Sequence, residues 1–166
     1  IENWSRNMYN LNTKRAIVDE NGTIEWVSGS FGSKVSLLYP MSVLRGEGAK
    51  SEFTGITFAG KDQYLDTGAK VIHAAPRTSS SIISKSISKG NGVAIYRGLV
   101  DVKPNCPGCK STVTCESLML DQESQSDTIP VINIQTSDID LGHEAKIGRI
   151  DDDVIFYLMT RGIPEG

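Results

Sequence analysis

Short runs of alternating apolar and polar residues recur along most of the chain, and each is bounded by glycine, proline, asparagine or aspartate. Alternation with a period of two is typical of β-strands, whereas stretches with helical spacing are nearly absent. The pattern therefore predicts an all-β protein. The predicted strands are Thr23–Val27, Lys34–Leu38, Glu52–Ala59, Ala69–His73, Ser81–Ser88, Val93–Val102, Thr112–Leu120, Pro130–Gln135 and Ile139–Ile150.

The serine-rich run 79–89 bears on which β architecture is present. Its even positions place Ser84, Ser86 and Ser88 on one strand face. Small residues on one face suit the close stacking of strands in a solenoid, where no coil can bury its own face alone. The Asn21-Gly22 pair fits instead the tight hairpin of a sandwich. The pattern alone leaves solenoid and sandwich equally supported.

The pattern changes after residue 150. Asp151–Asp153 precede the apolar run Val154–Met159, and Gly162 and Pro164 follow it. Aspartates at a helix start satisfy free N–H groups and complement the helix dipole, and glycine and proline end helices. We predict an α-helix from Asp152 to about Thr160. The expected organisation is a β-rich segment, 1–150, and the start of a helical region, 151–166.

Composition narrows the function classes. The 166 residues predict one domain, with 39% hydrophobic and 22% charged residues as in ordinary soluble proteins. A net charge of −3 argues against a surface that tracks nucleic-acid phosphates. No apolar run approaches the roughly 20 residues of a membrane helix. The odd number of cysteines and the absence of a signal peptide favour a reducing, cytosolic compartment, and the start at Ile1 suggests a piece of a longer protein.

The cysteines are the first candidates for chemistry. Cys115 shares its predicted strand face with Val113 and Ser117, so a buried core cysteine is the plain structural alternative. Cys106 and Cys109 form a C-x-x-C motif in a predicted turn, a spacing that can chelate one metal ion or form a redox disulfide. No second pair completes a four-cysteine site, and a solvent-exposed turn is the alternative.

His143 and Glu144 are adjacent on a predicted strand, so their side chains should point to opposite faces, with His143 inward. A thiolate with an imidazole or a carboxylate suits a soft or borderline metal such as iron. The structural alternatives are a hydrogen-bonded core histidine and a solvated glutamate. His73 is most simply a packing histidine. No phosphate-binding glycine motif and no nucleophile elbow is present, so nucleotide binding and serine-hydrolase chemistry have no support.

Several longer strings occur in order along the chain: Phe58–His73, Pro76–Gly98, Cys115–Leu120, Asp127–Pro130, Gly142–Ala145 and Phe156–Gly162. In these strings the chain resembles the SufB/SufD family of iron–sulfur cluster assembly proteins, specifically its SufB branch, from about Asn12 onward. The resemblance implies a right-handed parallel β-helix, which decides between solenoid and sandwich. A helical C-terminal region that docks the SufC ATPase should follow. Family members are usually much longer, so the chain is expected to hold the later coils of the core.

The resemblance also implies a scaffold rather than an enzyme, on which iron and sulfide assemble before transfer to client proteins. Cys115 matches the core cysteine implicated in assembly, and His143 and Glu144 match the histidine and glutamate beside it. The implied cofactors are a transient iron–sulfur cluster and, in the full complex, reduced flavin. The implied partners are a SufC-type ATPase, a SufD-type subunit or a second SufB, and a sulfur-donating desulfurase system, with neither nucleic acid nor a membrane. The implied location is the cytoplasm or a plastid-type organelle.

The chain departs from the family pattern in two places. Many members lack cysteines at the positions of Cys106 and Cys109, which are therefore either extra ligands or incidental. Some relatives have glutamate where this chain has Gly142, which removes one candidate ligand. Two rival functions stand beside the scaffold: a β-helix subunit that mediates pairing without holding the cluster, and a carbohydrate-active β-helix. The latter needs acidic residues gathered in one groove, whereas the acids here are scattered.

Overall fold

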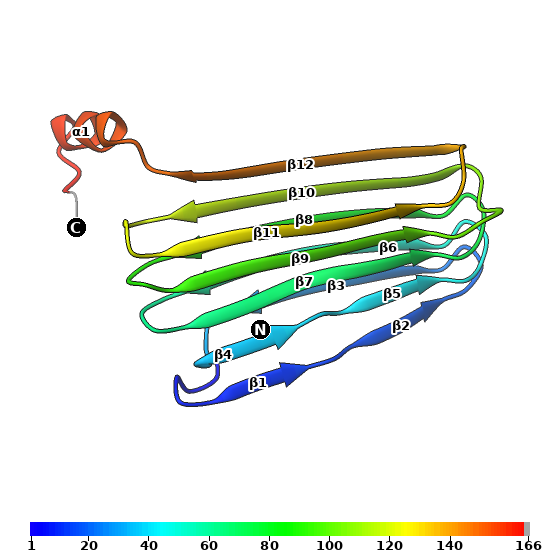
Figure 1. Cartoon of the computed structure of the whole chain (residues 1–166), viewed down its shortest axis with the longest axis horizontal. Coiled ribbons are helices and arrows are strands. Elements are labelled where there is room, and N and C mark those ends of the chain that lie inside the picture. Colours follow the sequence, from blue (N-terminus) through cyan, green and yellow to red (C-terminus); the bar gives the residue numbers. More distant parts are fainter. Residues whose placement is uncertain (165–166) are drawn as a thin grey trace.

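Parallel strands wound in successive coils form the body of the molecule (Figure 1). The structure, a computed structural model, describes residues 1–164. The predicted parallel β-helix with one short C-terminal helix is confirmed. The elements are β1 (Tyr9–Asn12), β2 (Arg15–Val18), β3 (Thr23–Ser30), β4 (Val35–Leu38), β5 (Met41–Leu44), β6 (Lys50–Ala59), β7 (Tyr64–His73), β8 (Ser79–Ser88), β9 (Val93–Val102), β10 (Cys109–Met119), β11 (Gln125–Ile134), β12 (Ile139–Arg149) and α1 (Asp152–Thr160).

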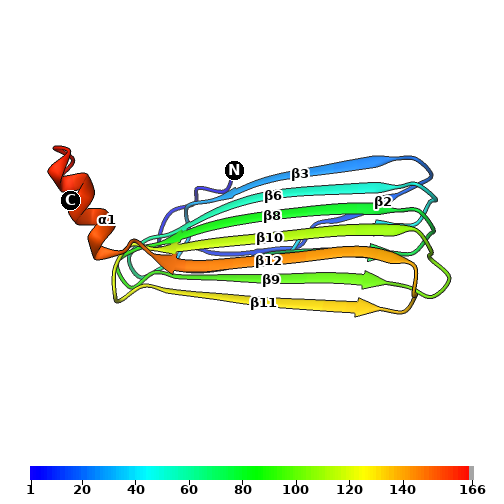
Figure 2. The same ribbon diagram turned by 90° about the horizontal axis from the view of Figure 1, so that it is seen from above.

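Two parallel sheets enclose the interior. One runs in the order β12-β10-β8-β6-β3, and Figure 2 shows these strands side by side. The other contains β1, β2, β4, β5, β7, β9 and β11. Lys50 pairs with Ser79 and Ser79 with Lys110, so that each coil takes about 30 residues. Each strand therefore stacks on the strand one coil earlier in the chain, and a residue's neighbours lie one coil away.

The core lies between the two sheets and consists of the inward-facing residues of each strand. Leu44, Leu65 and Val102 are completely buried there. The even-numbered face of the serine-rich run, predicted to stack, also lies inside: Ser88 is fully buried, while Ile83 on the other face is 38% exposed. Alternation of side chains along a strand thus sorts residues between core and solvent.

The structure contains three strands that the alternation pattern did not predict: β1, β2 and β5. Each has four residues, too few for a period of two to be distinctive. Strand β7 also begins earlier than predicted, at Tyr64 instead of Ala69. Its first half contains the buried Asp66, whose carboxylate accepts hydrogen bonds from Arg97 Nε at 3.0 and 2.8 Å. This buried carboxylate, paired with the exposed Arg97, interrupts the apolar pattern on which the prediction rested.

Helix α1 has the predicted bounds. The carboxylate of its N-cap residue, Asp151, accepts a hydrogen bond from the Asp153 backbone N–H at 3.0 Å. None of its residues is buried, and it projects beyond the end of the coils (Figure 1). Residues 165 and 166, which close the predicted helical segment, lie outside the described residues.

In the part of the chain that the structure describes, no helix is both long enough and apolar enough to cross a membrane.

Candidate functional site

Cys115 lies on the inward face of β10, with a free thiol and an exposed fraction of only 4%. The residues paired with it on the neighbouring coils are Ser84 on β8 and Ala145 on β12. Both are small residues. The buried position predicted for this cysteine is therefore confirmed.

The sequence analysis missed Tyr96, on the opposing strand β9, as a neighbour of this thiol. The ring is 5% exposed, and the buried hydroxyl has no hydrogen-bond partner among the described residues. Gly98 leaves room for it, because a Cβ there would lie 2.7 Å from the hydroxyl oxygen. A tyrosine two residues before a glycine on a buried strand is the only sequence signal for this arrangement.

Burial raises the pKa of the Cys115 thiol to about 11, and the nearby Tyr96 hydroxyl acts in the opposite direction, lowering the pKa. Burial likewise raises the pKa of Tyr96 itself. The Tyr96 hydroxyl makes no hydrogen bond to the thiol, yet the two groups are close enough to affect each other's pKa. The phenol is thus placed to stabilise negative charge on the sulfur.

Replacing Tyr96 with phenylalanine is expected to raise the pKa of Cys115 further, by about one unit, because a donor to the thiolate is lost. Stability should stay the same or rise slightly, since the deleted hydroxyl has no partner. The measurement is the rate of Cys115 alkylation by iodoacetamide against pH, resolved by peptide mass spectrometry, with Cys109 as internal reference. An unchanged pH profile at Cys115 would show that the phenol does not act on the thiol.

His143 lies on β12, paired with Val113 of β10 and therefore on the same sheet face as Cys115. Standard strand geometry places the two Cα atoms about 8 Å apart. The opposite orientation predicted for Glu144 is also found: its carboxylate lies 2.8 Å from Lys146 Nζ on the outer face. The structure thus brings Cys115 and His143 to one sheet face and leaves Glu144 on the other. His143 is nevertheless exposed, because no further coil covers β12 among the described residues, so the core-histidine alternative is wrong.

Glu144 belongs to a row of charges on the outer face of this sheet. Glu116, next to Lys146 in the strand register, lies 2.8 Å from Lys85 Nζ. The hydrogen bond and charge of Lys85 lower the pKa of Glu116, and those of Glu144 raise the pKa of Lys146. These exposed pairs contribute little to stability. Among residues 1–164, no three histidine, cysteine or acidic side chains are close enough to hold a metal ion.

Cys106 and Cys109 are buried, with exposed fractions of 2% and 0%. The expected alternative, a solvent-exposed turn, is therefore wrong for the cysteines themselves. The reason is that Cys109 is already the first residue of β10 and shares the inward face of Cys115, while Pro107 between the two cysteines stays exposed. Neither cysteine of this motif lies beside His143 in the strand register.

His73 is the packing histidine that the sequence predicted. It is completely buried, with Nδ1 2.8 Å from Thr78 Oγ1 and Nε2 3.0 Å from Ser80 Oγ. Ser80 in turn lies 2.8 Å from Ser111 Oγ one coil further on. These contacts form a buried polar network that links β7, β8 and β10. Burial lowers the pKa of His73 from 6.5 to about 4.

The stability of the chain should therefore decrease as the pH falls from 6.5 towards 4. In this range the unfolded chain binds a proton at His73, whereas the folded chain does not. This difference lowers the free energy of unfolding by up to about 3 kcal/mol. Urea unfolding at a series of pH values measures this dependence. In a His73→Gln variant the same range should give a flatter profile. Equal slopes in the two proteins would assign the acid sensitivity to other groups.

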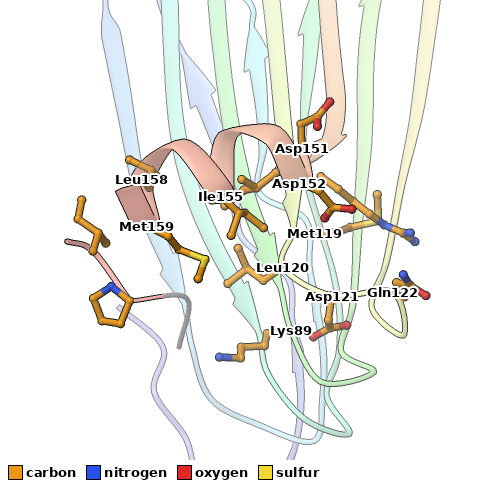
Figure 3. A pocket seen from close by; sticks show the side chains of 14 residues that line it. Lys89, Met119, Leu120, Asp121, Gln122, Asp151, Asp152, Ile155, Leu158 and Met159 are labelled. Carbon is orange, nitrogen blue, oxygen red and sulfur yellow. The ribbon is translucent and has the colours of Figure 1, made fainter. Parts of the chain in front are cut away.

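A separate hollow of about 750 Å³ lies between α1 and the turn that follows β10 (Figure 3). Ile155, Leu158 and Met159 of the helix line one side, and Leu120 and Lys89 lie across from them. The residues that line it include none of the three cysteines and neither histidine. This hollow is therefore distinct from the Cys115 site.

Comparison with known proteins places these features in one family. Residues 1–166 match the family model described as SUF system FeS cluster assembly, SufBD core domain. Proteins described as iron–sulfur cluster assembly SufBD family proteins are similar: those of Staphylococcus haemolyticus and Staphylococcus epidermidis are 53% identical, and that of Staphylococcus saprophyticus is 52% identical, over 99% of this chain. The chain spans 36% of the length of these relatives. The chain belongs to the SufBD family of the SUF system for iron–sulfur cluster assembly.

Proposed function

We propose that the chain is part of a SufB-type scaffold on which iron–sulfur clusters are assembled for transfer to client proteins, with Cys115 as the principal ligand. One observation carries the proposal: a free, buried thiol faces an unpartnered tyrosine hydroxyl and shares its sheet face with His143. The family relation supplies the kind of cargo, iron and sulfide. The role is that of a scaffold, and ATP hydrolysis belongs to a partner subunit.

The chemistry of the donors suits a cargo that has to leave again. A buried thiol with a pKa of about 11 is protonated at neutral pH, so iron must displace its proton, and binding releases that proton. One thiolate and one imidazole hold iron less firmly than four thiolates do. The chain would thus bind iron reversibly at Cys115 and His143, and partners or sulfide would complete the coordination.

Glu144 is the third member of the proposed ligand set, and it needs a local rearrangement to take part. Its carboxylate must leave Lys146 and reach the other face of the sheet. Within the described residues β12 is the edge strand of its sheet and pairs with β10 alone, so a shift of β12 disrupts one ladder only. Loading of the site and movement of β12 are therefore coupled in this proposal.

The proposed partners follow from the same family relation. A SufC-type ATPase engages the helical region that begins with α1, where Phe156 and Tyr157 expose 68% and 56% of their surface. A SufD-type subunit or a second SufB completes the complex. A desulfurase system supplies sulfur, and reduced flavin supplies electrons in the full complex. The proposed location is the cytoplasm.

The test is anaerobic reconstitution with ferrous iron and sulfide, alone and with a SufC-type and a SufD-type subunit. Visible sulfide-to-iron absorption and bound iron are measured after removal of free ions. The proposal predicts absorption and stoichiometric iron in at least the complex. A complex that binds no iron beyond the partners' own content would overturn it.

A second function, subunit pairing without cluster binding, is favoured by one observation. Within residues 1–164 both β11 and β12 are edge strands with mostly exposed residues, and unpaired strand edges readily accept another strand. Light scattering over a range of concentrations tests this function. A mass that remains that of the monomer at every concentration, with and without a SufD-type subunit, would exclude it.

A further inference from the structure

The C-x-x-C motif forms a turn whose shape brings the two cysteine backbones together. Pro107 and Gly108 occupy its two central positions, and Gly108 has a φ of +72°. Proline followed by a residue with positive φ is the signature of a type II β-turn, which brings the outer Cα atoms within about 7 Å. Disulfides join residues whose Cα atoms are about 4.4 to 6.8 Å apart. The turn therefore holds Cys106 and Cys109 within disulfide range.

The two thiols are close in space, and both are free. Burial raises the pKa of Cys106, and the neighbouring Cys109 raises it further. Both cysteines are buried, but their neighbours in the turn, Asn105 and Pro107, are exposed to solvent. A small reagent therefore reaches the two thiols only when this turn opens.

The surroundings favour a disulfide over a bound metal ion. A divalent ion would balance two thiolates, but such an ion takes about four ligands. Among the described residues no third histidine, cysteine or acidic side chain lies close enough to supply one. The nearest polar group is Thr78, whose Oγ1 lies 3.2 Å from Cys109 Sγ and donates a hydrogen bond to Ala75 O at 3.1 Å. A disulfide is neutral and requires no compensating charge.

Oxidation also leaves few hydrogen-bonding groups without partners. Cys109 Sγ donates a weak hydrogen bond to Ala75 O at 3.5 Å, and this carbonyl keeps Thr78 as a donor when the thiol proton is lost. Cys106 Sγ donates to Pro104 O at 3.5 Å, next to exposed residues of the turn where water can replace it. The interior of the turn can therefore accommodate either redox state.

We propose that Cys106 and Cys109 form a reversible dithiol–disulfide site that exchanges with low-molecular-weight disulfides. One cysteine thiolate attacks the reagent disulfide, which forms a mixed disulfide and releases one reagent thiol. The second cysteine attacks the protein sulfur of that mixed disulfide, which closes the Cys106–Cys109 bond and releases the second thiol. The two protein thiols lose two electrons and two protons, and the reagent disulfide gains them. The site requires neither iron nor the Cys115 chemistry.

The test uses glutathione disulfide followed by unfolding, alkylation and trypsin digestion. Trypsin does not cleave before Pro104, so Cys106 and Cys109 fall in the single peptide 98–110, and Cys115 falls in the next. The expected product is a 98–110 peptide that is two hydrogens lighter and not alkylated, which dithiothreitol restores. The number of alkylated cysteines should fall from three to one per chain.

Matched variants identify the partners. Cys106→Ser and Cys109→Ser should each prevent the internal disulfide, whereas Cys115→Ser should form it as the wild type does. Full alkylation of both cysteines after prolonged oxidation at about pH 8.5 would overturn the proposal, and so would an internal bond to Cys115. Because no iron is present, neither result bears on the cluster-assembly function.

Discussion

Replacing Cys115 with alanine is expected to abolish iron–sulfur cluster formation on the chain while the fold stays intact. Among the described residues, no other thiol shares a sheet face with His143 at so short a register distance. Alanine keeps the Cβ and the strand geometry, so the loss of one buried sulfur should cost only about 1 kcal/mol. The measurements are bound iron and visible absorption after reconstitution, with circular dichroism and urea unfolding to confirm the fold.

The matched control is Cys109→Ala, which removes a cysteine that is equally buried on the same face of the same strand. It should load iron as the wild type does, since its thiol lies at the far end of β10 from the site. If Cys115→Ala loaded as much iron as this control, Cys115 would not be the principal ligand. If both variants lost the signal, the motif at Cys106 and Cys109 would belong to the site.

Gly68→Ala is expected to destabilise the chain by about 3 kcal/mol or more. A Cβ at this position would lie 1.8 Å from the carbonyl oxygen of Arg97, its paired residue on β9. This carbonyl belongs to the backbone of a parallel ladder, so it cannot move aside as a flexible side chain can. Relief of the clash must separate β7 from β9, in the middle of the solenoid. Urea unfolding at neutral pH measures the loss.

Gly142→Ala provides the comparison, because it makes the same chemical change in a strand where nothing lies within 4 Å of the new Cβ. Its stability should stay within about 0.5 kcal/mol of the wild type. A similar loss in both variants would mean that the effect comes from the intrinsic cost of alanine in a strand. A tolerated Gly68→Ala would mean that the two strands can separate without cost.

Local patterns in the sequence were sufficient for most strand positions, for the helix and for the faces of His143 and Glu144, because these depend on alternation and capping within a few residues. They did not predict the burial of Asp66, which is stabilised by Arg97 one coil away. The side chains that surround Cys115 could not be predicted from the sequence either. Its neighbour Tyr96 is brought beside it across the interior from β9, and no local pattern records a contact made between sheets.

The inward face of β10 has a consequence for changes in chain length. Cys109 and Cys115 both face the core because an even number of steps separates them along one strand. Deletion of a single residue between them would turn one of the two thiols towards solvent, although every functional side chain would still be present. Deletion of two residues would keep both thiols inside and move them closer together. For relatives that gain or lose residues in this strand, the parity of the length change decides whether a buried thiol survives.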